Sequence, residues 1–137
     1  VVDRAAGFEA STDSGVSRSV IVPDGGELKV VLAWTDPPST STAEVNLVND
    51  LDLVVEGPTG TYLGNVFESG VSVPGNEPDR LNNLEVVWLR DAVPGVWRIR
   101  VVPHRIQLGP QPWALVAVGD VEELRPRRAD GRRGAVP

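Results

Sequence analysis

Short apolar runs, most of them alternating with polar residues, follow one another along the chain at nearly regular spacing. In Val96–Val102, one face consists of Trp97, Ile99 and Val101, and the positions between them are Arg98 and Arg100. A period of two predicts a half-exposed β-strand. The runs that we interpret as strands are Ser17–Val22, Leu28–Thr35, Leu51–Gly57, Thr61–Gly64, Leu84–Leu89, Val96–Val102 and Trp113–Val118.

Two of these runs indicate more than their secondary structure. Leu28–Thr35 is apolar on both faces and predicts a central strand. Leu84–Leu89 has one strongly apolar face and one mixed face. They consist of Leu84, Val86 and Trp88 on one side and of Glu85 and Val87 on the other.

Turn signals separate the runs, as in Pro23-Asp24-Gly25-Gly26 and Gly57-Pro58-Thr59-Gly60. The helix candidates lie at the two ends and are weak; Val121–Leu124, for example, is a single turn that Pro126 stops. Strands at this spacing without helices predict an all-β fold, an antiparallel β-sandwich or jelly roll of about eight strands.

The domain organisation that we expect has three parts. Residues 1–16 are mixed and turn-rich and are interpreted as a linker from an upstream domain. Residues 17–120 form the β-sandwich domain, and residues 121–137 form an Arg-rich, flexible tail. Two long connections, Asp36–Asp50 and Asn65–Asn83, are candidates for function because long loops of compact domains often carry it.

Composition narrows the function classes. The chain has 137 residues, no Cys and a formal net charge of −6, of which the tail carries +2 and residues 1–120 carry −8. No disulfide framework is possible, and an acidic body argues against a nucleic-acid partner. No apolar run approaches the ~18 residues of a membrane span, and no signal peptide is present, so an export signal would lie outside this chain.

The sequence contains no set of residues that is typical of a catalytic site. His104 is the single His, it follows Pro103 at a strand end, and no Gly-flanked Ser lies near it in the sequence. A serine hydrolase needs a nucleophile, a base and an orienting group, and a zinc site needs several His or Cys ligands. We therefore expect no enzyme activity from this chain.

Hard oxygen ligands are present instead. Asp50 and Asp52 fall on one face of a strand, about 7 Å apart, and repel each other unless a positive group lies between them. A Ca²⁺ ion would supply this positive charge. Asp36 would be a third ligand if the strand that it ends pairs with the strand of Asp50 and Asp52. Alternatively, these are turn residues, or Asp52 bonds a backbone N–H or an Arg. A second oxygen-rich cluster comprises Asn65, Asn76, Glu77, Asp79, Asn82 and Asn83.

The four tryptophans fall within the apolar runs, which favours core packing. The alternative is an aromatic platform that stacks on sugars. The tryptophans are Trp34, Trp88, Trp97 and Trp113.

Several strings resemble the C-terminal β-sandwich of subtilisin-like serine proteases of the alkaline, oxidatively stable type, a domain similar to the P-domain of proprotein convertases. They are LKVVLAWTDPP (28–38), LVNDLDL (47–53), PTGT (58–61), NNLE (82–85), PGVW (94–97) and GPQPWALV (109–116). The resemblance runs in order from about Ser17 to Asp120. It implies a jelly-roll domain beside a catalytic domain, and bound calcium, with Asp36, Asp50 and Asp52 as the matching acidic positions.

The leading hypothesis is therefore a non-catalytic accessory domain of a secreted subtilisin-like protease, which supports folding, stability or substrate positioning. Its partner would be the protease domain of the same polypeptide, and we expect an extracellular monomer. The alternative is an extracellular carbohydrate- or surface-binding module.

Overall fold

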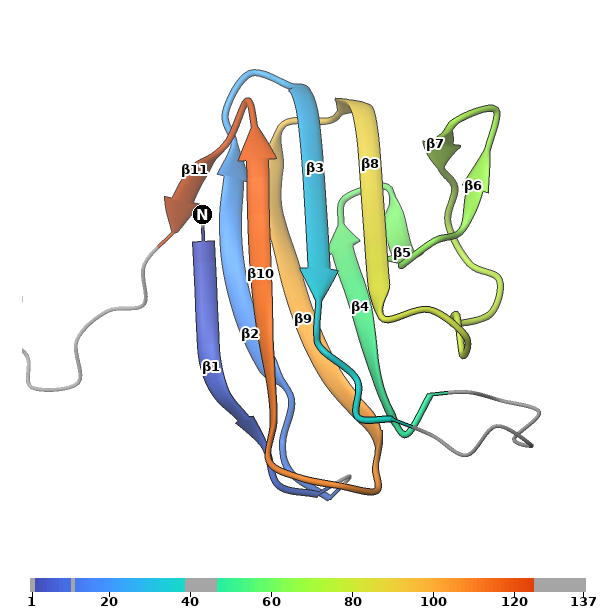
Figure 1. Ribbon diagram of the computed structural model, residues 1–137. Helices are drawn as coiled ribbons and strands as arrows, with labels where there is room; N and C mark the ends of the chain where they lie inside the picture. The colour runs from blue at the N-terminus through green and yellow to red at the C-terminus, as the bar shows by residue number, and fades with distance from the viewer. Residues whose placement is uncertain (1, 11, 39–46, 125–137) are drawn as a thin grey trace, which may run out of the picture.

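The alternating runs form strands of two antiparallel sheets that pack face to face, which confirms the predicted all-β sandwich (Figure 1). The computed structural model describes residues 2–10, 12–38 and 47–124. Its strands are longer and more numerous than the pattern alone indicates, because short edge strands carry too few residues to show a period. No helix long and apolar enough to cross a membrane occurs in those residues.

Sheet A has the strand order β1-β10-β3-β8. Its strands are β1 (Val2–Phe8), β10 (Gln111–Gly119), β3 (Gly26–Ala33) and β8 (Leu84–Ala92). Sheet B has the order β11-β2-β9-β4-β5. Its strands are β11 (Glu122–Leu124), β2 (Val16–Val22), β9 (Gly95–Ile106), β4 (Asn49–Gly57) and β5 (Gly60–Leu63). A small hairpin, β6 (Phe67–Glu68) with β7 (Val71–Ser72), lies in the long connection before β8.

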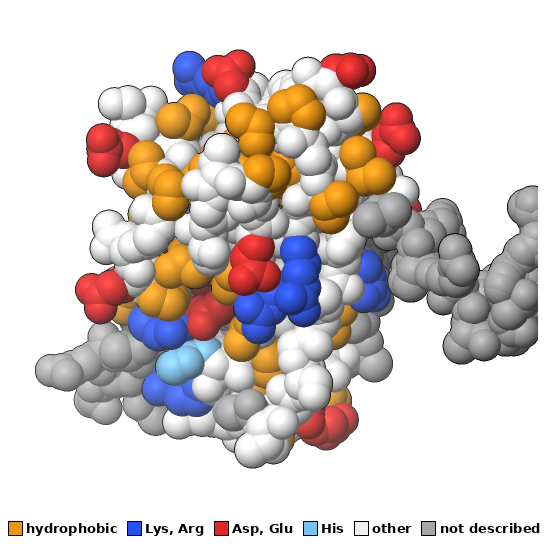
Figure 2. All heavy atoms as spheres, turned by 180° about the vertical axis from the view of Figure 1, so that it is seen from behind, with side chains coloured by type: hydrophobic (Ala, Val, Ile, Leu, Met, Phe, Trp, Pro, Cys, Tyr) orange, Lys and Arg blue, Asp and Glu red, His pale blue; other side chains and the backbone are white. Residues whose placement is uncertain are grey.

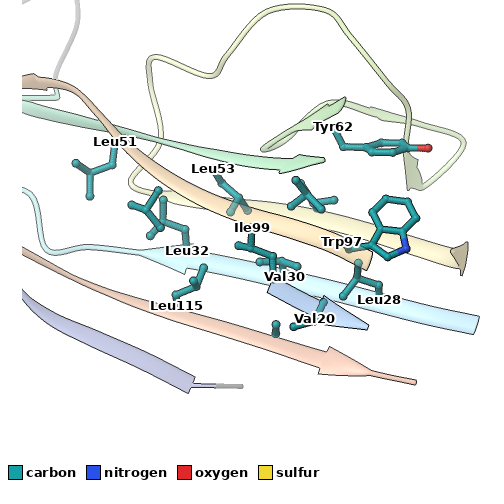
Figure 3. Close-up of a cluster of buried hydrophobic side chains, with 14 of the residues drawn as sticks. Val20, Leu28, Val30, Leu32, Leu51, Leu53, Tyr62, Trp97, Ile99 and Leu115 are labelled. Atoms are coloured by element: carbon teal, nitrogen blue, oxygen red, sulfur yellow. The ribbon is translucent and has the colours of Figure 1, made fainter. Parts of the chain in front are cut away.

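The core lies between the two sheets (Figure 3). Trp97 is fully buried, and its indole Nε1 donates to the carbonyl of Val93 at 3.0 Å. Gly57 makes room for it, since a Cβ there would lie 2.1 Å from the indole ring. Removing such side chains from water is the main stabilising term, at about 1.5 to 3 kcal/mol for each large apolar residue. Around Trp97 the fully buried residues include Leu28, Leu32, Leu51, Leu53, Ile99 and Leu115.

Both ends of the described chain differ from expectation. Residues 2–8, which we interpreted as part of a linker, form β1 and pair with β10 at the edge of sheet A. Residues 122–124, at the start of the expected tail, form β11 and pair with β2. A mixed composition predicts neither strand, because an edge strand gains its order from backbone hydrogen bonds to its neighbour. Residues 125–137 lie outside the described residues.

Strand β8 presents its mixed face to the core. Glu85 and Val87 point inward and are 1% and 0% exposed, whereas Leu84 is 50% exposed. The apolar face with Val86 and Trp88 therefore lies on the outside of sheet A. Hydrophobicity alone favours the opposite orientation, and the structure overrides it through the contacts that Glu85 makes inside.

Candidate functional site

The first half of β4 lies at the edge of sheet B, since β5 does not extend along it. β4 pairs with β9 along its length but with β5 only from Val54 onward. On the free side, the backbone N–H of Leu53 donates to Glu85 Oε1 at 2.9 Å, and the Leu53 carbonyl accepts from Gly64 N at 3.0 Å. Glu85 of sheet A and Gly64 thus satisfy the backbone groups of Leu53 in sheet B.

Two aspartates of β4 point away from the core on the same strand. Leu51 and Leu53 are fully buried between the sheets, so Asp50 and Asp52 project from the opposite face, as their spacing predicts. Their side chains are nevertheless only 3% and 12% exposed. Arg80, from the connection between β7 and β8, lies against them.

Arg80 supplies the positive charge between the two carboxylates. Its Nη1 donates to Asp50 Oδ2 at 3.2 Å and to Asp52 Oδ1 at 2.5 Å. The Arg80 side chain is itself 35% exposed. Of the alternatives that the sequence leaves open, an arginine partner for Asp52 is therefore present.

Glu85 brings a third carboxylate to the same place. Oxygens of Asp50, Asp52 and Glu85 lie within 4.8 Å of one another, and all three residues are buried. Two buried oxygens of this group, Asp50 Oδ1 and Glu85 Oε2, have no hydrogen-bond partner among the residues that the structure describes. We call these three residues the carboxylate cluster. Gly64 leaves the space for it, because a Cβ there would lie 2.4 Å from Glu85 Oε1.

Burial weakens the acidity of the whole cluster. It is the largest cause that raises the pKa of Glu85, to about 8; the Leu53 N–H lowers this pKa, and the charges of Asp52 and Asp50 raise it further. Burial likewise raises the pKa of Asp50 and of Asp52, and Arg80 offsets part of both shifts. Glu85 therefore carries a proton at neutral pH in the metal-free protein.

Asp36 takes a different role. Its two carboxylate oxygens accept the backbone N–H groups of Val48 and Asn49, both at 2.8 Å. It thereby ties the end of the β3 segment to the start of β4. Asp36 therefore binds backbone groups of this connection. The sequence suggests Asp36 as the third member of the carboxylate cluster, whereas in the structure the third member is Glu85.

Asn49, next to the cluster, is a fully buried junction. Its Nδ2 donates to the Leu108 carbonyl at 2.8 Å and to Gln111 Oε1 at 2.7 Å. Its Oδ1 accepts the N–H groups of Gln107 and Leu108 at 2.9 and 3.1 Å. The side chain thus fastens the start of β4 to the turn between β9 and β10.

The second oxygen-rich cluster of the sequence holds its own loop together. Asp79 Oδ2 accepts from Asn65 Nδ2 at 2.6 Å and from Asn82 Nδ2 at 2.7 Å. Burial acts to raise the pKa of Asp79, but these hydrogen bonds and those from the backbone of Leu81 and Asn82 bring it below its ordinary value. Asn65 also accepts the N–H of Val86 at 2.9 Å, so this loop covers the edge of β8.

Three of the four tryptophans belong to the core. Trp34, Trp97 and Trp113 are at most 4% exposed, which confirms core packing for them and removes them as a sugar-stacking platform. Trp88 is half-buried on the outside of sheet A, with Lys29 Nζ 5.7 Å and the Arg90 guanidinium 4.9 Å from its ring centre. His104 is exposed on β9.

The carboxylate cluster fits a hard divalent cation by its donor set. All of its donors are oxygens, as Ca²⁺ and Mg²⁺ prefer, and two of them are buried without a partner. Arg80 occupies one side of the cluster, so a bound cation would share or replace its ion pairs. The cluster can therefore hold one divalent cation. Without a cation, it holds the Arg80 guanidinium and a proton on Glu85.

In metal-free solution, Arg80→Leu is expected to lower the free energy of unfolding by about 2 kcal/mol, because it leaves two buried carboxylates without a cation. The partial exposure of Arg80 keeps this below the cost for a fully buried pair. Urea unfolding with a chelator present measures it. The matched control is Arg98→Leu, which removes an exposed pair with Glu56 at 3.9 Å and should cost less than about 0.5 kcal/mol. Equal losses in the two variants would contradict the role given to Arg80.

Fold and site together define a small antiparallel β-sandwich with a buried three-carboxylate cluster beside the part of β4 that does not pair with β5. No protein-family model matches the chain. It is 33% identical over 93 residues to "Serine protease/ABC transporter B family protein tagB" of Dictyostelium discoideum, a match of 65% of this chain and 5% of that protein. Its identity to the tagA protein of that organism is 31% over 97 residues, 66% of this chain and 5% of that protein.

The tagD protein of the same organism, which carries the same description, is 31% identical over 111 residues, 73% of this chain and 6% of that protein. The chain thus spans only about a twentieth of the length of these curated relatives. The similarity is distant and partial, and it links the chain to a short stretch of serine protease/ABC transporter proteins.

Proposed function

We propose that this chain is a non-catalytic accessory domain of a larger serine protease of the subtilisin-like type, and that it supports the folding and stability of the protease domain. The similarity to a short stretch of three proteins described as serine protease/ABC transporter B family proteins carries the proposal. The fold agrees with it, since a β-sandwich of this kind is what the sequence resemblance implies. We propose with it that the domain works outside the cell.

Deletion of this segment from the parent polypeptide tests the accessory role. We expect the truncated protease to yield less active enzyme and to lose activity faster on heating than the intact one. The isolated chain should hydrolyse no peptide substrate. An unchanged yield and heat-inactivation rate after deletion would overturn the accessory role, and hydrolysis by the pure chain would overturn the non-catalytic assignment.

We further propose that the carboxylate cluster binds Ca²⁺. Binding to the native state alone raises its stability, by about 2.7 kcal/mol when free Ca²⁺ is 100 times its dissociation constant. For a domain of this size we expect a melting temperature about 5 °C or more above that in chelator. Differential scanning calorimetry of the isolated chain measures this shift.

The variant that tests this metal site is Asp52→Asn, which keeps the shape of the side chain and removes one anionic ligand, and its matched control is Asp36→Asn. We expect Asp52→Asn to abolish most of the calcium-dependent shift, whereas Asp36→Asn, outside the cluster, should retain it. The same melting temperature in calcium and in chelator for the unaltered chain would rule out the metal proposal.

A further inference from the structure

The outer side of sheet A is apolar across three adjacent strands. The register places Val31 of β3 between Val86 of β8 and Val116 of β10. The outer side of an antiparallel sheet is ordinarily polar, and a contiguous apolar patch on a surface commonly marks an interface. Figure 1 looks onto this side, and none of the described strands crosses in front of it. We define the outer apolar face as Val31, Leu84, Val86, Trp88, Val116 and Val118.

The opposite side of the molecule provides the contrast. Figure 2 shows charged side chains gathered across the middle of the outer side of sheet B. There the Glu56 carboxylate lies 3.9 and 3.8 Å from the guanidinium nitrogens of Arg98 and Arg100, and Arg98 also donates to Ser17 Oγ. A charged surface of this kind remains solvated, whereas the apolar surface of sheet A gains free energy when it is covered.

Bulky side chains form the row at one end of the outer apolar face. In the register, Lys29 of β3 lies between Val118 of β10 and Trp88 of β8. Trp88 is held in place, because its Nε1 donates to Glu27 Oε2 at 2.7 Å and the cations of Lys29 and Arg90 lie over its ring. A large aromatic side chain that is already ordered loses little conformational freedom on binding, which is typical of residues that dominate an interface.

Small side chains form most of the row at the other end of this face. There Ala33 of β3 lies between Ala114 of β10 and Leu84 of β8. A hollow of about 320 Å³ opens beside the two alanines and is lined by Ala33, Trp34, Thr35, Pro112, Trp113 and Ala114. The outer apolar face therefore has a raised row and a hollowed row, one on each side of its middle row of valines.

A raised row and a hollowed row make this face complementary to a second copy of itself. A two-fold axis in the interface, perpendicular to the strands and along the middle row of valines, places each raised row on the hollowed row of the partner. Val118 then lies over Ala114 of the partner subunit, and Trp88 over Leu84 of the partner subunit. A two-fold axis along β3 would instead stack Lys29 on Lys29 of the partner subunit, and like charges so close repel each other.

We propose that two copies of this chain associate through their outer apolar faces, about the two-fold axis perpendicular to the strands. The inference is independent of the proposed function, since it involves no protease domain. It differs from the monomer that we expect from the sequence, because the sequence does not show that the apolar side of β8 faces outward.

The size of sheet A suits a reversible dimer. Four strands about 4.8 Å apart and about eight residues long, at about 3.4 Å per residue, give a face of about 500 Å². A pair of copies therefore covers about 1,000 Å² in total, which is close to the lower limit for a specific interface. We expect a dissociation constant of about 10 to 100 µM, so that the dimer predominates only at high protein concentration.

Sedimentation equilibrium of the 137-residue chain tests the association. We expect mainly dimer at about 500 µM and monomer at about 1 µM. Val118→Glu should weaken the association about tenfold or more, whereas Val96→Glu, on the outer side of sheet B, should leave it unchanged. The two sites are matched, because Val118 is 48% and Val96 is 52% exposed. Both variants must keep the unaltered melting temperature, which separates lost association from lost folding. A chain that stays monomeric at about 500 µM, or equal weakening by the two variants, would overturn the proposal.

Single introduced cysteines test the axis itself, because the chain has no Cys of its own. Val116 lies on the axis and faces Val116 of the partner subunit. Sheets that face each other lie about 10 Å apart, so a bismaleimide of about 8 Å can join the two thiols of Val116→Cys. We expect covalent dimers from Val116→Cys at a yield about tenfold or more above that from Val96→Cys. An equal yield from position 96, or no covalent dimer from position 116, would show that the outer apolar face is not the contact.

Discussion

Raising the pH from about 5 to about 9 in the presence of a chelator is expected to destabilise this domain, with a loss of up to about 4 kcal/mol traceable to Glu85. Burial raises the pKa of Glu85 to about 8 from its ordinary 4.5. The folded protein therefore binds the Glu85 proton more tightly than the unfolded chain does. The stabilisation is fully present below pH 4.5 and declines as the pH rises toward 8, because the unfolded chain has by then released its proton.

The proton also explains an unpartnered atom. Glu85 Oε1 accepts the Leu53 N–H, whereas the buried Glu85 Oε2 has no partner. A proton on Oε2 removes a buried charge from the carboxylate cluster and makes this oxygen a donor. Protonation thus reduces the repulsion within the carboxylate cluster.

Glu85→Gln isolates this effect, because the amide keeps an acceptor for Leu53 and is neutral at every pH. We expect the variant to lose most of the slope of unfolding free energy against pH between about 6 and 9, and to exceed the unaltered chain in stability at the alkaline end. Urea unfolding at several pH values measures the slope. Glu56→Gln, on the exposed side of sheet B, should leave it unchanged. A slope that persists in Glu85→Gln would assign it to another group.

The second large effect is expected from Asn49→Ala, which should lower the free energy of unfolding by about 4 kcal/mol. The substitution removes four hydrogen bonds of a fully buried side chain. It also leaves the N–H groups of Gln107 and Leu108 without their acceptor. Since these residues belong to the turn between β9 and β10, that turn should loosen from the start of β4.

Asn82→Ala is the matched control for Asn49→Ala. Asn82 is exposed, and its side chain donates one hydrogen bond, to Asp79. The same change of residue type should therefore cost less than about 1 kcal/mol. Chemical unfolding compares the two variants, and hydrogen exchange of the Gln107 and Leu108 amides should rise in Asn49→Ala alone. A loss for Asn49→Ala no larger than that for Asn82→Ala would show that the buried junction contributes little.

The sequence predicts two of the four residues of the candidate site, Asp50 and Asp52, but not Glu85 or Arg80. Asp50 and Asp52 stand two residues apart in a strand, and this spacing alone predicts that they share a face. Glu85 gave no such signal, because it follows Asn82-Asn83-Leu84 in a different strand and alternates with apolar residues like any solvent-facing glutamate. Its inward position depends on the free side of β4, where the Leu53 N–H needs an acceptor. Arg80 likewise comes from a long connection whose path no local pattern predicts.

The sequence by itself determined the class of this protein: the period of two and the turn residues between the runs require antiparallel strands, and the buried positions of β9 follow from their own alternation. Only the tertiary structure decided which side of β8 faces inward and that residues 2–8 form a strand of sheet A. It also brought three carboxylates together at one edge. The physical reason is the same in each case. Alternation is a local property of one strand, whereas pairing at an edge, and the satisfaction of a backbone group by a side chain from the other sheet, depend on segments distant in the sequence.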